Sequence, residues 1–101
     1  GKYTESLSTL LKVKEMAPER PRTHHNIAMM YDFMKDKEKA EQFLKKEIEV
    51  VDNLNSRMEL MSFYIDNNQL KKALAYGNEI LSDYPEAEQV KQAVEAIRNQ
   101  L

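Results

Sequence analysis

The chain contains no cysteine and no tryptophan, and it has only two glycine and three proline residues among 101 residues. Without cysteine it can form no disulfide and no thiolate metal site, and it has no thiol nucleophile. So little glycine and proline excludes collagen and Gly/Ser linkers. Lack of cysteine leaves the localisation open, because a helical domain of this size can fold in the cytoplasm or in the periplasm.

Long hydrophobic runs are also missing. No window approaches the roughly 18 consecutive apolar residues of a membrane-spanning helix, and the N-terminus lacks the basic-then-apolar pattern of a signal peptide. We therefore expect no direct membrane insertion by this segment. Neither sign of charge predominates, since the chain has 15 Lys and Arg residues and 17 Asp and Glu residues. This balance provides no basic face for nucleic acid.

Apolar residues recur at three- and four-residue steps almost from end to end, which predicts an all-α fold. Short breaks at proline, asparagine and aspartate divide the pattern. The predicted helices cover residues 2–16, 22–34, 37–51, 56–66, 70–83 and 86–100. Asp36 is the expected N-cap of the third helix, and Ser56 with Glu59 has capping-box spacing at the start of the fourth.

The chain repeats itself. Tyr31 and Ala40 recur one period later as Tyr64 and Ala73. One period earlier, Leu44 corresponds to Leu10, and Pro18 lies two periods before Pro85. Fixed-period self-similarity is typical of stacked helical arrays.

A helix–turn–helix period of about 34 residues with these residue types resembles the tetratricopeptide repeat, whose pattern is W-x2-L-G-x2-Y…A-x3-F…P. Residues 21–53 match it with Ile27, Ala28, Tyr31, Ala40 and Leu44, and residues 54–87 match it with Leu60, Met61, Tyr64, Ala73, Gly77 and Pro85. The resemblance implies a right-handed helical-repeat solenoid, an α-α superhelix of antiparallel helix pairs. Its single domain, 1–101, comprises a half repeat (1–20), two repeats (21–53 and 54–87) and a capping helix (86–101).

Several positions depart from the family pattern. His24 and Arg57 occupy its Trp position, and Glu47 occupies a usual Ala position. We expect His24 to pack in the core and Glu47 to pair with Arg57. In the last helix, the stripe of Val90, Val94, Ile97 and Leu101 predicts a buried face, and Glu88, Lys91, Glu95 and Arg98 are expected to face water.

No residues suggest catalysis. Adjacent helical residues such as His24 and His25 diverge by about 100°, whereas a two-histidine metal clamp needs i, i+4 spacing. Gly-rich phosphate loops, nucleophile elbows and His-Glu-x-x-His helices are absent. We therefore predict no enzymatic activity, no catalytic residue, no metal site and no cofactor.

The family resemblance implies a concave groove lined by the first helix of each repeat. Its residues would be Arg22, His25, Met29, Asp32, Phe33, Asn55, Met58, Ser62, Ile65 and Asp66. This set is mixed in character and lacks a cluster of Lys and Arg that could clamp a C-terminal carboxylate.

We therefore expect a protein–protein interaction module that presents this groove to a peptide or helix of a protein partner. The alternative is a structural or regulatory segment of a larger protein, which packs on neighbouring domains or on itself.

The first predicted helix resembles the second helix of a pair whose first helix is missing. Its apolar residues are Leu7, Leu10, Leu11 and Val13. Either a helix upstream in a longer chain covers them, which we favour because the residues begin in mid-pattern, or a homodimer buries them through the N-terminal helix.

Overall fold

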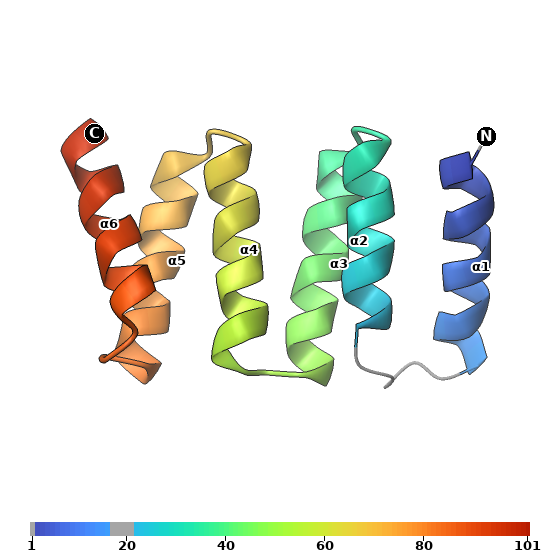
Figure 1. Ribbon diagram of the computed structural model, residues 1–101, viewed down its shortest axis with the longest axis horizontal. Helices are drawn as coiled ribbons and strands as arrows, with labels where there is room; N and C mark the ends of the chain where they lie inside the picture. Colours follow the sequence, from blue (N-terminus) through green and yellow to red (C-terminus); the bar gives the residue numbers. More distant parts are fainter. Residues whose placement is uncertain (1, 17–21) are drawn as a thin grey trace. The chain divides into compact units, whose positions relative to one another are not determined.

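The computed structural model describes residues 2–16 and 22–101, and from residue 5 onward it also describes the side chains of the first helix (Figure 1). Pro18, Pro21 and the side chain of Tyr3 lie outside the described residues. Six helices occur in the described ranges: α1 (Lys2–Met16), α2 (Thr23–Phe33), α3 (Lys37–Val50), α4 (Leu54–Asp66), α5 (Leu70–Asp83) and α6 (Glu88–Gln100). No strand occurs in those ranges, so the all-α helical-repeat prediction is confirmed.

The predicted helix boundaries agree with the structure to within two residues. Asp36 is the N-cap of α3, as predicted, and its carboxylate accepts a hydrogen bond from the Lys39 N–H at 3.3 Å. The capping box of α4 lies three residues earlier than predicted. Asn53 Oδ1 accepts from the Ser56 N–H at 2.8 Å, and Ser56 Oγ accepts from the Asn53 N–H at 3.3 Å. Asn53 is thus the cap, and Ser56 is its partner.

The turns α2–α3 and α4–α5 occupy equivalent places in the two repeats and have the same structure. Lys35 and Asn68 both adopt left-handed backbone conformations, with φ of 65° and 58°. In each turn two backbone hydrogen bonds reach back into the preceding helix, from Lys35 and Asp36 in the first turn and from Asn68 and Gln69 in the second. This is the Schellman arrangement, here with a side chain where glycine is usual. The sequence period therefore corresponds to a structural period.

The chain divides into two compact units, residues 1–56 and 57–101. In the first unit α2 packs on α3 and on α1. Its core contains Ile27, Ala28, Ala40 and Leu44, each at most 1% exposed. The Phe43 ring stacks on two rings of α2, with centroids 5.6 Å from Tyr31 and 6.1 Å from His24. His24 is buried, as the sequence predicts.

In the second unit three helices meet at Gly77. A Cβ atom built on Gly77 would lie 2.6 Å from a methyl group of Val94 on α6 and 2.8 Å from the terminal methyl of Met61 on α4. Real Cβ atoms essentially never come so close to other heavy atoms. Glycine at this position therefore allows Met61 to occupy a site where the family pattern has a small residue.

The last helix packs by its apolar stripe, as predicted. Val90, Val94 and Ile97 are each at most 4% exposed, whereas Glu88, Glu95 and Arg98 are exposed and Lys91 is half-buried. The prediction for Leu101 is wrong. This residue follows the last helical residue and is 61% exposed, because its side chain borders the hollow next to Leu70, although its backbone N–H still donates to the Ile97 carbonyl oxygen.

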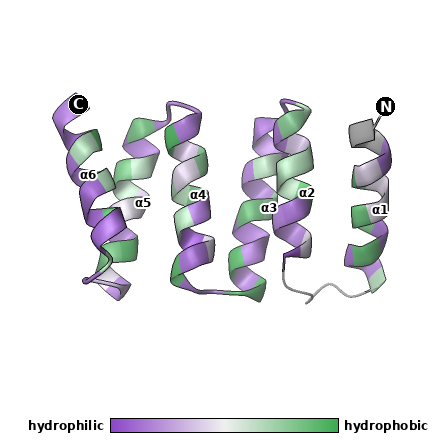
Figure 2. Cartoon of the chain, in the orientation of Figure 1, coloured by the Kyte–Doolittle hydropathy of each residue, from purple (hydrophilic) through white to green (hydrophobic). Residues whose placement is uncertain are grey.

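Figure 2 shows hydrophobic and hydrophilic residues alternating around the described helices. Within the described ranges, none of these helices is both long enough and apolar enough to cross a membrane.

The contacts of Gly77 predict the effect of adding one methyl group. Gly77→Ala should improve helix propensity by about 0.5–1 kcal/mol. The methyl group must also displace Val94 and Met61, and such overpacking typically costs about 1–3 kcal/mol. We therefore expect a net loss of stability of about 1 kcal/mol in chemical denaturation, because the second effect is larger.

Asn78→Ala is the matched control, since Asn78 is the next residue of α5 and is exposed. It should change the stability by less than about 0.5 kcal/mol. A Gly77→Ala variant that is more stable than the wild type would contradict the close approach of α4 and α6 to Gly77.

Candidate partner-binding surface

The ten predicted groove residues lie on α2, on α4 and at the residue before α2. None of them is fully buried. Arg22, Phe33, Asn55, Ser62 and Asp66 are exposed, and His25, Met29, Asp32, Met58 and Ile65 are half-buried. The same helices bury other residues, which are Ile27 and Ala28 on α2 and Leu60, Met61 and Tyr64 on α4. Each helix thus has a solvent-accessible side that contains its predicted groove residues.

The α2 part of this surface combines apolar and charged groups. Phe33 is 60% exposed, which is unusual for so large an apolar side chain. Asp32 accepts a hydrogen bond from the ammonium group of Lys37, so an ion pair holds its carboxylate in place. Met29 lines a hollow of about 440 Å³ between α1 and α2. A ligand would meet flexible apolar groups and one fixed carboxylate.

A buried carboxylate fixes the start of this surface. Glu47 of α3 is 2% exposed, and its two oxygens accept hydrogen bonds from the backbone N–H groups of Arg22 at 3.0 Å and His25 at 3.2 Å. Arg22 is the N-cap of α2 in a left-handed conformation, and its own side chain makes no capping bond. Glu47 therefore caps α2 from the neighbouring helix.

Sequence reasoning missed this role and expected Glu47 to pair with Arg57. Within its own unit, Arg57 donates from its guanidinium group to Asp83 at 2.5 Å and lies over the Tyr84 ring. The sequence signal for the capping role was an acidic residue at a position where the family has alanine.

His24 lies beside this cap in the core of the first unit. Burial lowers the pKa of His24, and the positive charges of Lys14 and Lys46 lower it further, although the nearby Glu47 carboxylate acts in the opposite direction. Both ammonium groups lie 5.0 Å from the centre of the Phe43 ring, on which His24 also stacks. His24 is therefore a neutral packing residue near pH 7.

Within residues 2–16 and 22–101, no group of three or more His, Asp or Glu side chains is placed to hold a metal ion.

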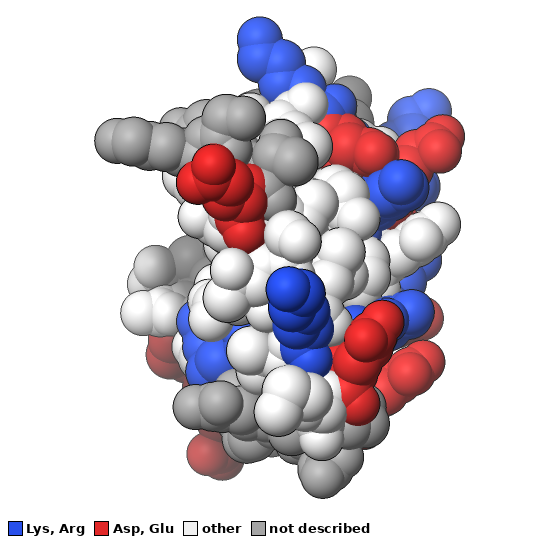
Figure 3. All heavy atoms as spheres, turned by 90° about the vertical axis from the view of Figure 1, so that its right-hand side faces the viewer, with Lys and Arg blue, Asp and Glu red and all other residues white. Residues whose placement is uncertain are grey.

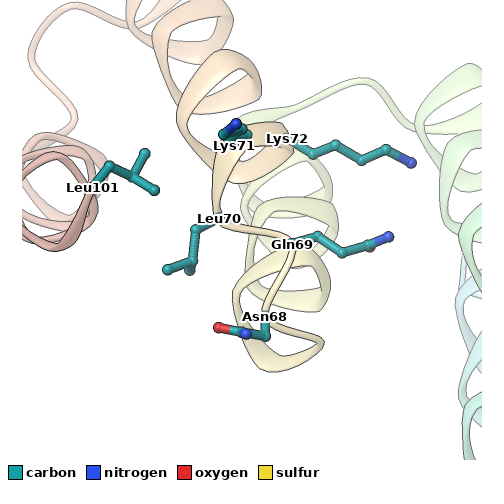
Figure 4. Close-up of a pocket in the computed structure, with 6 residues that line it drawn as sticks. All are labelled: Asn68, Gln69, Leu70, Lys71, Lys72 and Leu101. Atoms are coloured by element: carbon teal, nitrogen blue, oxygen red, sulfur yellow. The ribbon is translucent and has the colours of Figure 1, made fainter.

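A second hollow, of about 460 Å³, lies at the end of the second unit. Figure 4 shows Leu70 and Leu101 facing each other across it, while the side chains of Gln69 and Lys72 point away. The polar groups do not converge on one point, as they do in most small-molecule sites.

Comparison with known proteins identifies the fold. A family model described as tetratricopeptide repeat matches residues 21–50. Among solved structures, a thermophilic TPR protein of Thermus thermophilus matches with a TM-score of 0.77 and 22% sequence identity. The match covers 94% of this chain and 49% of that protein, so the chain spans about half its length. The search of curated proteins found no match.

The capping role of Glu47 predicts a large effect of its removal. Glu47→Ala leaves the part-buried N–H groups of Arg22 and His25 without their carboxylate, and a donor that is left unpaired away from water costs about 1–3 kcal/mol. Denaturation should show a loss in this range. The control is Glu49→Ala, at an exposed position on the same helix. It should change the stability by less than about 0.5 kcal/mol. Equal effects of the two variants would contradict the capping role.

The lowered pKa of His24 predicts acid sensitivity. Because its folded pKa lies below the unfolded value of 6.5, the unfolded chain takes up the proton first. This contribution to stability is complete above pH 6.5 and is lost as the pH falls below it. In His24→Phe, the unfolding free energy should fall less between pH 7 and pH 5 than in the wild type. Parallel curves for the two proteins would contradict a buried neutral His24.

Proposed function

Because residues 21–50 match the tetratricopeptide repeat model and the chain has a helical-repeat fold like that of a tetratricopeptide repeat protein, we propose that this chain is a protein-interaction module. The proposed binding surface consists of the ten groove residues, one set belonging to α2 and one to α4. The observation that supports it most directly is that all ten are accessible to solvent, while Ile27, Ala28, Leu60, Met61 and Tyr64 of the same helices form core.

The side chains of this surface define the class of ligand. Met29, Phe33, Met58 and Ile65 offer apolar contacts, and two of them are flexible methionines that adapt to different partners. Asp66 adds negative charge, and the carboxylate of Asp32 is already paired with Lys37. The proposed ligand is a peptide segment or helix with apolar anchor residues and a basic residue among them.

One familiar kind of ligand fits this surface poorly. A C-terminal carboxylate needs several convergent cationic groups. Arg22 is the only Lys or Arg among the ten residues. We therefore propose an internal peptide segment or a helix as the ligand, and not a free chain terminus.

A displayed library of random peptides tests the proposal. Peptides selected on the wild-type chain should lose affinity for Met29→Ala, Met58→Ala and Ile65→Ala, by roughly tenfold for an anchor contact worth more than about 1 kcal/mol. Affinity is measured by fluorescence anisotropy. Circular dichroism on each variant separates lost binding from lost folding.

Glu49→Ala and Lys71→Ala are the controls, because these residues are exposed and lie on the second helices of the two repeats. They should leave the affinity unchanged. Selected peptides whose affinity depends on the control positions, and not on Met29, Met58 or Ile65, would overturn the proposed surface.

A further inference from the structure

Among the residues that the structure describes, one face of α1 lacks the cover that its equivalent has on α3. On α3, Ala40, Phe43, Leu44 and Glu47 are buried, and α2 packs on this helix. One period upstream, the corresponding residues of α1 are Ser6, Thr9, Leu10 and Val13. Ser6 and Thr9 are exposed, and Leu10 and Val13 are only half-buried. The repeat therefore shows what this face is shaped to receive, which is one more antiparallel helix.

The uncovered face forms one side of the hollow between α1 and α2. Ser6, Thr9 and Leu10 line it from α1, and Asn26, Met29 and Met30 line it from α2. None of these side chains carries a formal charge. Thr9 already donates its hydroxyl to the Glu5 carbonyl oxygen at 3.2 Å, so burying it leaves no donor unpaired. Figure 3 shows this side of the chain, with uncharged atoms over much of its centre and charged side chains scattered among them.

Three large exposed apolar side chains lie on the same two helices. Met16 ends α1 and is 85% exposed. Phe33 and Met34 are at the end of α2 and are 60% and 42% exposed. Because α1 and α2 run in opposite directions (Figure 1), these residues mark the two opposite ends of the helix pair. Exposed apolar groups of this size commonly mark a surface that binds another protein.

The charges of α1 are complementary to those of an inverted second copy. Glu5 and Lys12 are exposed and about two helical turns apart, so they lie on the same flank of α1. When two copies of α1 pack antiparallel about a two-fold axis between residues 8 and 9, Glu5 of each copy lies level with Lys12 of the other. One Glu5 and one Lys12 in each copy thus form two ion pairs related by the two-fold axis.

The sizes of the side chains fit the same arrangement. In this register Ser6 of one copy lies level with Leu11 of the second copy. Leu10 of the second copy is one residue away, so a small residue of one helix faces large residues of the other. In the second unit Gly77 and Met61 form such a small–large contact. The inverted second copy also runs parallel to α2, which brings its Met16 to the end of the helix pair where Phe33 lies (Figure 1).

We propose that two copies of this chain associate through α1 and the adjoining hollow, with their α1 helices antiparallel about a two-fold axis. This homodimer surface shares only Met29 and Phe33 with the ten groove residues of the proposed binding surface. The apolar contacts supply most of its stability, and the ion pairs between Glu5 and Lys12 fix the direction and register of the two helices.

Sedimentation equilibrium of the 101-residue chain tests the dimer, and charge reversal tests its geometry. Glu5→Lys places two like-charged pairs in the interface, and so does Lys12→Glu. Each should raise the dimer dissociation constant about tenfold, given two pairs worth up to about 1 kcal/mol each. The double variant should regain the wild-type value. An equimolar mixture of the two single variants should form heterodimers in preference to either homodimer, because both pairs between unlike copies join opposite charges, whereas both pairs in each homodimer join like charges.

Two further variants test the face of the helix. Ser6→Arg places a long charged side chain in the uncharged hollow and should abolish the dimer, while Ser8→Arg on the far side of α1 should leave it intact. Circular dichroism confirms folding in both cases. A chain that stays monomeric up to near-millimolar concentration would overturn the proposal and leave the hollow to a different helix. A dimer that is indifferent to Ser6→Arg and to the charge reversals would overturn it equally.

Discussion

Both repeats depend on one constraint, which is that a helix pair can approach closely only where one of the two facing residues is small. In the second unit the small residue is Gly77 on α5, and the large one is Met61 on α4. In the first unit the corresponding positions hold Ala28 on α2 and Leu44 on α3, both fully buried. The small residue thus lies on the first helix of the pair in the first unit and on the second helix of the pair in the second unit. What the fold requires is the summed volume of the two side chains, and not a particular residue at either position.

The local parts of this structure could be predicted from the sequence, because they depend on residues close together in the chain. The helical period, the Asp36 cap and the buried stripe of α6 are of this kind. The start of α4 could not be placed as well. Asn53 and Ser56 both favour N-cap positions, and each has a suitable partner three residues later. The structure resolves the choice through Ser56, whose hydroxyl also donates to the Val51 carbonyl oxygen at 2.6 Å.

The solvent-accessible side of α2 was also predictable in part, since a helix that buries Ile27 and Ala28 must turn Met29 in another direction. The ligand was not predictable to the same degree. Binding energy comes from the few side chains that a partner removes from water, and this depends on the shapes of both molecules. The uncovered face of α1 could be predicted to an intermediate degree, because the equivalent face of α3 is covered and shows what kind of element packs there.

Glu47 links the core to the proposed binding surface. Its carboxylate is bound to the backbone of Arg22 and His25, and both residues belong to that surface. An alanine at this position would pack as well but would give these N–H groups no partner, and the Arg22 side chain makes no capping bond. The negative charge is also favourable at the positive end of the α2 dipole. A buried carboxylate thus fixes where α2 begins relative to α3, and with it the backbone positions of the first two surface residues.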